Sequence, residues 1–214
     1  MRSAEIVVID YGMGNLLSVQ RGLEHVGAQV LVSADPERIR VAERVVLPGV
    51  GAFPDAMEEL ARRGLVSVIR EIAGRGTPLL GICLGMQVLF ETGAEFGETA
   101  GLAVLPGSVV AIPAEGADGQ AHKIPHVGWN ALYPSGGSRW EGTVLADVAA
   151  GEAAYFVHSF MAQPRDERHR IADCHYGGIP VAAVVGRENV VACQFHPEKS
   201  GDVGLRILRG FLTL

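Results

Sequence analysis

The feature of the sequence that most constrains its fold is the alternation of short apolar runs with longer amphipathic segments in the first half of the chain. Apolar runs of strand length lie at residues 5–10, 28–34, 43–49 and 77–83. Segments with apolar residues at helical spacing lie at residues 15–27 and 52–76, and Gly64 breaks the second of them. Strands that alternate with helices favour a parallel sheet whose two faces the helices cover. The first half therefore predicts an α/β fold.

The second half of the chain has a different pattern, in which short strand-like runs are separated by turn residues. One pair of runs predicts a hairpin that turns at residues 187–189, and an amphipathic helix is predicted over residues 201–214. No Pro- or Ser-rich linker divides the halves, so one α/β domain is expected, with a mixed, mostly parallel central sheet flanked by helices. The strand-like runs lie at residues 107–113, 128–134, 153–160, 169–177, 180–188 and 189–195.

Composition and charge exclude several classes of function. The formal net charge is −6 and no basic stripe is present, so a nucleic-acid partner is not expected. No apolar run has the length of a membrane helix, and the start of the chain lacks the hydrophobic region of a signal peptide. The cysteines are three in number without a CxxC pair, which favours a reducing cytoplasm over a disulfide framework. Pro125 between His122 and His126 disfavours a helical metal site, so no metal is expected. The GMGN turn at residues 12–15 lacks the full dinucleotide-binding motif, so no cofactor is expected.

Cys83 lies between two glycines where a predicted strand ends and an amphipathic helix is predicted to begin at Leu84. The pattern Gly81-x-Cys83-x-Gly85 is the thiol counterpart of a nucleophile elbow, a sharp turn that holds its central residue in a strained conformation. A helix that begins at Leu84 directs its positive end at the sulfur and offers a backbone N–H to an oxyanion. The alternative is a buried core cysteine beside glycines that only allow close packing.

A nucleophilic cysteine needs a base, and His196 is the candidate. Pro197 disfavours a helical conformation for His196, so the segment is expected to be extended, with Glu198 on the same side as the imidazole. The carboxylate then fixes the tautomer of the ring. Taken alone, the motif equally suits an ordinary histidine at a strand end beside a surface glutamate. Together with the elbow, it predicts a triad of Cys83, His196 and Glu198.

Two motifs, GICLGMQ at residues 81–87 and FHPEKS at residues 195–200, resemble those of class I glutamine amidotransferases of the triad type. Further stretches narrow the resemblance to glutaminase subunits that serve a separate synthase subunit in histidine biosynthesis; they lie at residues 9–19, 47–53, 123–130 and 155–160. The similarity extends from residue 6 to about residue 212 and leaves no room for a fused synthase domain. It implies that residues 1–214 form one glutamine amidotransferase type 1 domain.

The resemblance also implies the chemistry. The Cys83 thiolate attacks the side-chain amide of glutamine, and His196, oriented by Glu198, transfers protons. The backbone N–H groups of Leu84 and Val50 form the oxyanion hole, Val50 after a change in the orientation of its strand. The other implied glutamine-binding positions are Gly49, Gly51, Gln87, Glu95, Ser159 and Phe160.

Several of these positions also have simpler interpretations. Gly49 and Gly51 suit an ordinary turn after a strand. Glu95, judged without the family, is a solvated loop acid. His158 lies in an apolar strand, which favours a hydrogen-bonded structural histidine over a second base.

The implied partner is a separate (β/α)₈-barrel cyclase subunit that receives ammonia from this chain in a cytoplasmic heterodimer. By resemblance, the interface positions are Asn15, Val127, Trp129 and Asn130. An exposed tryptophan in a Gly-Trp-Asn segment is a plausible anchor, because interfaces favour such residues. A half-buried core tryptophan is the alternative.

Other functions remain open from sequence alone. The chain could serve another synthase of the same family, such as anthranilate or aminodeoxychorismate synthase, or act as a stand-alone cysteine hydrolase on other amides or esters. A binding module with a decayed site is a third alternative, which the complete set of triad residue types disfavours. Activity with and without each partner distinguishes these functions.

Overall fold

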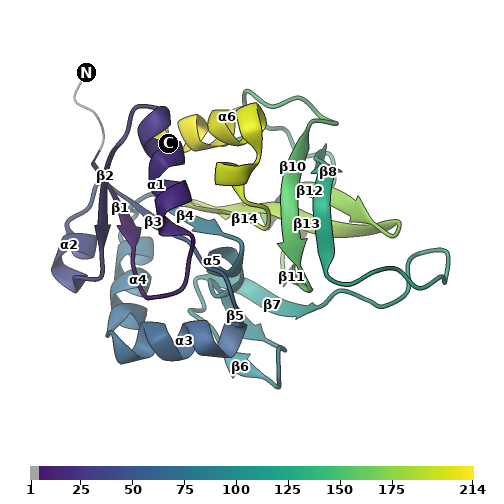
Figure 1. Cartoon of the computed structure of the whole chain (residues 1–214), viewed down its shortest axis with the longest axis horizontal. Helices are drawn as coiled ribbons and strands as arrows, with labels where there is room; N and C mark the ends of the chain where they lie inside the picture. Colours follow the sequence, from purple (N-terminus) through teal and green to yellow (C-terminus); the bar gives the residue numbers. More distant parts are fainter. Residues whose placement is uncertain (1–4) are drawn as a thin grey trace.

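Residues 5–214 are described by a computed structural model, in which helices cover both faces of an eight-stranded central sheet (Figure 1). Its strands, in sheet order, are β2 (Gln29–Ser33), β1 (Glu5–Ile9), β3 (Arg44–Leu47), β4 (Leu79–Ile82), β14 (Val190–Cys193), β13 (Ile179–Arg187), β12 (Arg170–Tyr176) and β9 (Tyr133–Pro134). The strands from β2 to β14 in this order run parallel, and the other three are antiparallel to their neighbours. The predicted α/β fold with a mixed, mostly parallel sheet is confirmed.

The helices of the two faces enclose separate apolar cores. One core lies under α1 and α6, and the other lies under α3 and α4. None of the helices within residues 5–214 has the length and apolar character needed to cross a membrane. The helix bounds are α1 Leu16–His25, α2 Pro36–Arg40, α3 Phe53–Arg62, α4 Leu65–Gly74, α5 Leu84–Gln87 and α6 Gly201–Leu212.

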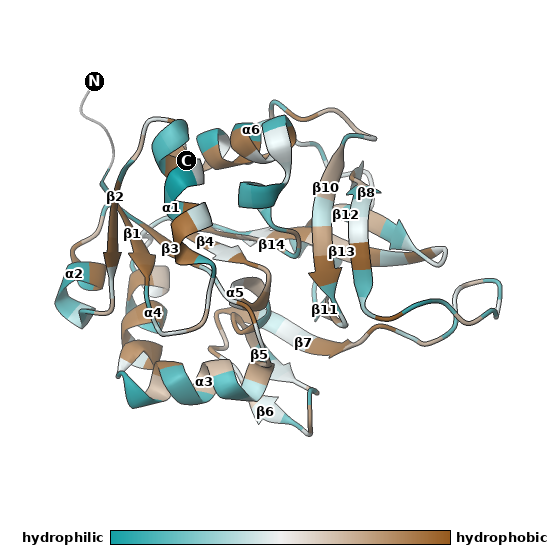
Figure 2. Cartoon of the chain, in the orientation of Figure 1, coloured by the Kyte–Doolittle hydropathy of each residue, from teal (hydrophilic) through white to brown (hydrophobic). Residues whose placement is uncertain are grey.

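Each parallel strand contributes to both cores, because successive side chains of a strand point to opposite faces. On β1, Ile6 and Val8 join the core under α1 and α6, whereas Val7 and Ile9 join the core under α3 and α4. Figure 2 accordingly shows the central strands as mostly hydrophobic, while the helices combine hydrophobic and hydrophilic segments. This two-sided burial explains why the strands are continuous apolar runs in the sequence.

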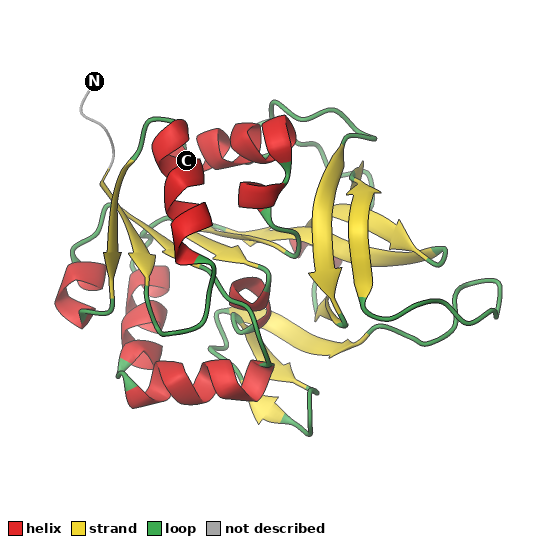
Figure 3. Cartoon of the chain, viewed as in Figure 1, coloured by secondary structure: helices red, strands yellow, loops and turns green. Residues whose placement is uncertain are grey.

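Strands dominate the part of the molecule that the second half builds (Figure 3). The predicted hairpin is confirmed, since β13 and β14 pair antiparallel around Glu188, which has a φ of +54°. Several other strands leave the central sheet and form a two-stranded sheet and a four-stranded sheet, which the sequence did not predict. These strands are β8 (His126–Ala131) with β10 (Ala153–His158), and β11 (Phe160–Pro164), β7 (Leu105–Ala111), β5 (Phe90–Gly93) and β6 (Thr99–Ala100).

The helical break predicted at Gly64 is present between α3 and α4, where Gly64 has a φ of +69°. The short helix α2 was missed, although its start has a clear signal. Asp35 accepts a hydrogen bond from the backbone N–H of Glu37 at 2.9 Å, and Pro36 follows it as the first helical residue.

The helix predicted from Leu84 was expected to be amphipathic, and this expectation is wrong. Helix α5 ends at Gln87, and every side chain from Leu84 to Phe90 is buried, so no polar face exists. The chain then turns into β5 because the carbonyls of Val88 and Leu89 accept hydrogen bonds from the segment at residues 102–105. This long-range pairing replaces further helical hydrogen bonds.

Candidate active site

Cys83 occupies a sharp turn between β4 and α5, with a φ of +54° and a ψ of −112°. A non-glycine residue in this region of φ is strained, as expected for a nucleophile elbow. The two flanking glycines lie in close contact with their neighbours. A Cβ at Gly85 would lie 1.8 Å from the carbonyl oxygen of Leu47, and one at Gly81 would lie 3.0 Å from the carbonyl oxygen of Gly85. The strained elbow therefore depends on glycine at position 85, and Gly81 leaves little room for a larger residue.

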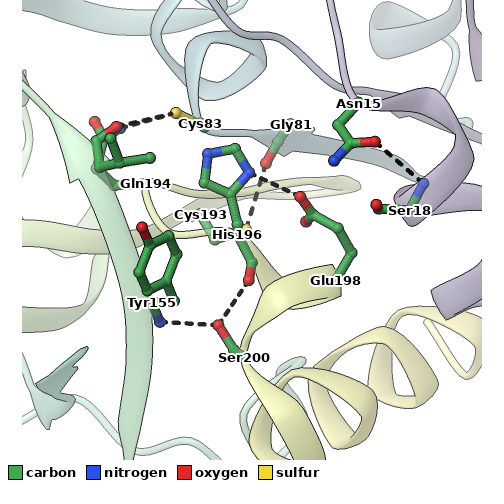
Figure 4. A network of polar contacts seen from close by, with 11 residues as sticks. Asn15, Ser18, Gly81, Cys83, Tyr155, Cys193, Gln194, His196, Glu198 and Ser200 are labelled. Carbon is green, nitrogen blue, oxygen red and sulfur yellow. Dashed lines mark hydrogen bonds and ion pairs between the residues drawn. The ribbon is translucent and has the colours of Figure 1, made fainter. Parts of the chain in front are cut away.

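His196 and Glu198 form a buried pair behind this turn (Figure 4). Nδ1 of His196 lies 2.8 Å from Oε1 of Glu198, and both side chains are almost completely buried. His196 is extended, as predicted, but Glu198 lies in a 3-10 turn over Pro197–Lys199 and not in an extended segment. The turn folds the carboxylate back onto the ring, so the pair forms by a different local geometry from the one expected.

The electrostatic surroundings of His196 favour its charged form. Burial lowers the pKa of the imidazole, but the neighbouring sulfur of Cys83 and the Glu198 carboxylate outweigh this effect and raise that pKa to about 9. Nε2 is buried and has no hydrogen-bond partner of normal geometry among the described residues, which leaves it free on the side of the ring away from Glu198. The sulfur of Cys83 accepts a hydrogen bond from Nε2 of Gln194 at 3.8 Å (Figure 4).

A cavity of about 300 Å³ opens beside the sulfur. It brings together residues that are far apart in the sequence, and most of them are predicted catalytic or glutamine-binding positions. Gly49 and Glu198 are not part of its lining, since Gly49 lies behind the elbow and Glu198 behind His196. The lining residues are Val50, Gly51, Cys83, Leu84, Gln87, Glu95, Pro125, Val157, His158, Ser159, Phe160 and His196.

The predicted oxyanion segment packs directly against the elbow. A Cβ at Gly49 would lie 2.8 Å from the backbone nitrogen of Gly85 and 2.9 Å from Cβ of Leu84. Gly51 has a φ of +111°, and Val50 between the two glycines is exposed at the cavity wall. Leu84 is the first residue of α5, so its N–H has no acceptor within the helix.

Gln87 and Glu95 already have hydrogen-bond partners in the protein. Nε2 of Gln87 donates to the carbonyl of Phe160 at 3.1 Å and to Oε1 of Gln194 at 3.0 Å. Oε2 of Glu95 accepts from the backbone N–H of Phe53 at 2.7 Å, at the start of α3. Gln87 thus has its amide oxygen left for a ligand, and Glu95 its second carboxylate oxygen.

Gln194 was missed by the sequence analysis. It is fully buried, and its amide joins Gln87 to the sulfur of Cys83. The signal was a single amide side chain at the end of an otherwise apolar strand, immediately before the Phe195-His196 pair. Buried amides need partners, so such a residue is a candidate for a polar site.

The four predicted interface positions differ in exposure and in their contacts. Val127 and Trp129 on β8 are 53% and 60% exposed, so the interpretation of Trp129 as a half-buried core residue is wrong. Asn15 is exposed and caps the start of α1. Asn130 is half-buried, and its side chain donates to the backbone carbonyl of His175 at 2.8 Å, away from the face of Val127 and Trp129.

The remaining cysteines, Cys174 and Cys193, are buried in the apolar core under α1 and α6. Burial raises the pKa of Cys174 to about 12 and that of Cys193 well above its ordinary value, so both are neutral thiols. All three cysteines are free, and no cluster of three or more His, Cys, Asp or Glu residues in the described chain could hold a metal ion.

Comparison with known proteins gives consistent results. A family model described as "Glutamine amidotransferase class-I" matches residues 7–213. The imidazole glycerol phosphate synthase subunit HisH 1 of Legionella pneumophila (strain Lens) is 47% identical over 99% of this chain and 100% of its own length. The HisH subunit of Geobacter metallireducens is 49% identical over 97% of each chain. A solved PurLQS structure from Thermotoga maritima has a TM-score of 0.71 at 19% identity, covering 99% of this chain and 98% of its own.

Proposed function

The chain belongs to the class I glutamine amidotransferase family, and from this premise we propose that it is the glutaminase subunit of an imidazole glycerol phosphate synthase. It hydrolyses glutamine to glutamate and ammonia and passes the ammonia to a HisF-type cyclase subunit. The cyclase uses the ammonia to convert PRFAR to imidazole glycerol phosphate and AICAR in histidine biosynthesis. The proposed setting is a cytoplasmic heterodimer in which residues 1–214 act as one amidotransferase domain.

The observation that carries the chemistry is the single cavity that joins Cys83, His196 and every predicted glutamine-binding residue except Gly49. The sulfur attacks the side-chain amide carbon of glutamine, and the carbonyl oxygen becomes an oxyanion. His196 is an imidazolium at neutral pH because its pKa is raised to about 9, so it can donate a proton to the departing ammonia. Glu198 holds the ring through Nδ1, which leaves Nε2 for this transfer.

The thioester that remains on Cys83 is then hydrolysed. His196, now neutral, takes a proton from water, the hydroxide attacks the thioester carbon, and glutamate leaves as the thiolate re-forms. In both steps the N–H of Leu84 stabilises the oxyanion, together with the N–H of Val50 once its peptide turns toward the cavity. Residues 47–49 pack on Leu84 and Gly85, which holds the segment of Val50 against the elbow.

The free oxygen atoms of the cavity indicate how glutamine binds. Phe53 bonds one carboxylate oxygen of Glu95, and the other oxygen is suited to bind the α-ammonium group of glutamine. The amide oxygen of Gln87 is a second acceptor, one helical turn from Cys83. The main chain of Ser159 and Phe160 forms the opposite wall. A ligand with an α-amino group and a terminal amide has complementary groups at both ends of this cavity.

A partner subunit is needed because ammonia released into water is protonated and no longer nucleophilic. A closed passage between subunits avoids this loss, and the exposed Val127 and Trp129 provide apolar contacts for docking. Identities of 47% and 49% to subunits named HisH, over nearly the full length of this chain, support a HisF-type cyclase as the partner.

The test is ammonia release from glutamine by the wild-type chain and by Cys83→Ala, each alone and with a HisF-type cyclase and its ligand. We expect low activity of the wild-type chain alone, strong stimulation by the loaded cyclase, and no activity of Cys83→Ala under either condition. High activity without stimulation would instead indicate a stand-alone hydrolase. Stimulation by a different synthase and not by the cyclase would indicate another member of the family.

A further inference from the structure

The two-stranded sheet of β8 and β10 has two faces with different roles. Val127 and Trp129 on β8 and Val157 on β10 are exposed on the outer face, where docking of the cyclase is proposed. His126 and His158 lie on the inner face, directly opposite each other in the strand register. They are 3% and 6% exposed, so both rings are removed from solvent.

These histidines form a chain of hydrogen bonds between Asn130 and Phe160. The side-chain nitrogen of Asn130 lies 3.3 Å from Nε2 of His126, and Nδ1 of His126 lies 2.9 Å from Nε2 of His158. Nδ1 of His158 lies 2.8 Å from the carbonyl oxygen of Phe160. The chain therefore connects the strand that carries Trp129 to the wall of the glutamine cavity.

The direction of every bond in this chain is determined by its two ends. The carbonyl of Phe160 can only accept, so Nδ1 of His158 carries a proton and Nε2 of this neutral ring accepts. His126 must then donate from Nδ1 and accept at Nε2. The nitrogen of Asn130 satisfies that acceptor, and its orientation is fixed by its bond to the carbonyl of His175 at 2.8 Å. Both rings are thus neutral Nδ1–H tautomers.

The carbonyl of Phe160 is a junction with the catalytic residues. It also accepts from Gln87, whose amide nitrogen contacts Gln194, and Gln194 contacts the sulfur of Cys83. Strand β10 makes a second connection, because the carbonyl of Tyr155 accepts from the backbone N–H of His196 at 3.0 Å. The β8–β10 sheet is therefore hydrogen-bonded both to the wall of the glutamine cavity and to the backbone of His196.

We propose that His126 and His158 are positioning residues that hold the Ser159–Phe160 wall of the glutamine cavity at a fixed distance from the docking face of β8. This inference rests on the proposed glutaminase function. It assigns the part of the structure through which docking of the cyclase affects the glutamine cavity. Because neither ring can change tautomer without breaking a buried hydrogen bond, a displacement of β8 by the cyclase is passed to Phe160. Neither histidine exchanges protons with the substrate.

The first test uses the heterodimer with His126→Leu and its conservative control, His126→Asn. Asparagine places an N–H near the position of Nδ1 and keeps the bond to His158, whereas leucine removes it. We expect His126→Leu to lower the stimulation by cyclase ligand about tenfold and to raise the KM for glutamine, with a much smaller loss of activity in the absence of the ligand. His126→Asn retains most of the stimulation.

Heterodimer affinity and thermal unfolding are measured on the same samples. A merely structural role would lower the basal and stimulated rates of His126→Leu by the same factor, and would overturn the proposal. The proposal would also be overturned if His126→Leu kept the wild-type stimulation and the wild-type KM for glutamine. It would likewise be overturned if His126→Asn lost as much stimulation as His126→Leu.

The second test needs no activity. Imidazole ¹⁵N chemical shifts of the wild-type chain report the tautomer of each histidine, and we expect Nδ1–H for both His126 and His158. An Nε2–H tautomer at either ring would overturn the inference, whatever the chain does to glutamine. If both rings are Nδ1–H but the loaded wild-type heterodimer releases no ammonia, the proposed function fails and the hydrogen-bonded pair stands.

Discussion

Replacing Gly85 by alanine tests whether the elbow depends on a close approach of two backbone segments. A Cβ at this position would lie 1.8 Å from the carbonyl oxygen and 2.8 Å from the carbonyl carbon of Leu47, at the end of β3. Real Cβ contacts do not fall below 3.0 Å, so the two segments must separate by more than 1 Å. Both neighbouring atoms belong to the backbone, and no side-chain rotation relieves the contact.

Two effects should follow from this separation. Overpacking of this kind costs about 1–3 kcal/mol of folding free energy, which for a domain of this size lowers Tm by roughly 2–12 °C. The separation also moves Cys83 and the N–H of Leu84 away from Val50, whose N–H completes the proposed oxyanion hole. A displacement of about 1 Å in a catalytic site reduces the rate about 100-fold, so kcat/KM should fall by at least this factor.

The assay compares Gly85→Ala with Gly74→Ala in thermal unfolding and in glutamine hydrolysis by the loaded heterodimer. Gly74 is an exposed helical residue of α4, and a Cβ there meets no atom within 4 Å. Gly74→Ala should therefore keep wild-type activity and gain about 0.5–1 kcal/mol of stability. If Gly85→Ala kept both wild-type activity and Tm, the elbow could not depend on this approach.

Three further predictions follow from the site. Glu198→Gln should reduce kcat by about 10²–10⁴-fold and lower the pKa of His196, which a pH–rate profile measures; an unchanged profile would exclude Glu198 from the triad. Burial, with a smaller contribution from neighbouring histidines, lowers the pKa values of His126 and His158 from 6.5 to about 4. Both histidines therefore stabilise the fold above pH 6.5, and this stabilisation is lost as pH falls toward 4. The pKa of His196 is raised, so its effect on stability has the opposite pH dependence: the stabilisation is present below pH 6.5 and is lost as pH rises through about 9. Urea-unfolding midpoints measured from pH 4 to 9 should therefore peak near neutrality. His196→Asn should remove the decrease in stability on the alkaline side. Trp129→Ala should raise the Kd for the cyclase by about 30-fold without changing the unfolding of the isolated chain, and calorimetric titration showing equal affinities would place the interface elsewhere.

The sequence predicted most of what is local in this site. Cys83 and its glycines form a contiguous strand–turn–helix pattern, and His196 and Glu198 are two residues apart, so short-range rules were sufficient to propose their contact. The alternating apolar runs likewise predicted the central sheet, because buried parallel strands and covering helices leave different periodicities.

Features that depend on long-range pairing were not predictable in the same way. Helix α5 ends after one turn because backbone N–H groups of residues 102–105 donate to the carbonyls of Val88 and Leu89. No local sequence signal predicts that these hydrogen bonds replace helical ones. Gln194 reaches Cys83 only because β14 lies beside β4 in the sheet. His126 and His158 meet because β8 and β10 pair, although they are separated by 32 positions.

The proposed chemistry depends on Cys83 being a nucleophile that His196 and Glu198 activate. The most direct measurement treats the heterodimer with a glutamine-derived electrophile and maps the modified residue by mass spectrometry of peptides. We expect stoichiometric modification of Cys83 alone, slowed strongly in His196→Asn and prevented by excess glutamine. Modification of Cys174 or Cys193 at a comparable rate, or equal labelling of Cys83 with and without His196, would contradict it.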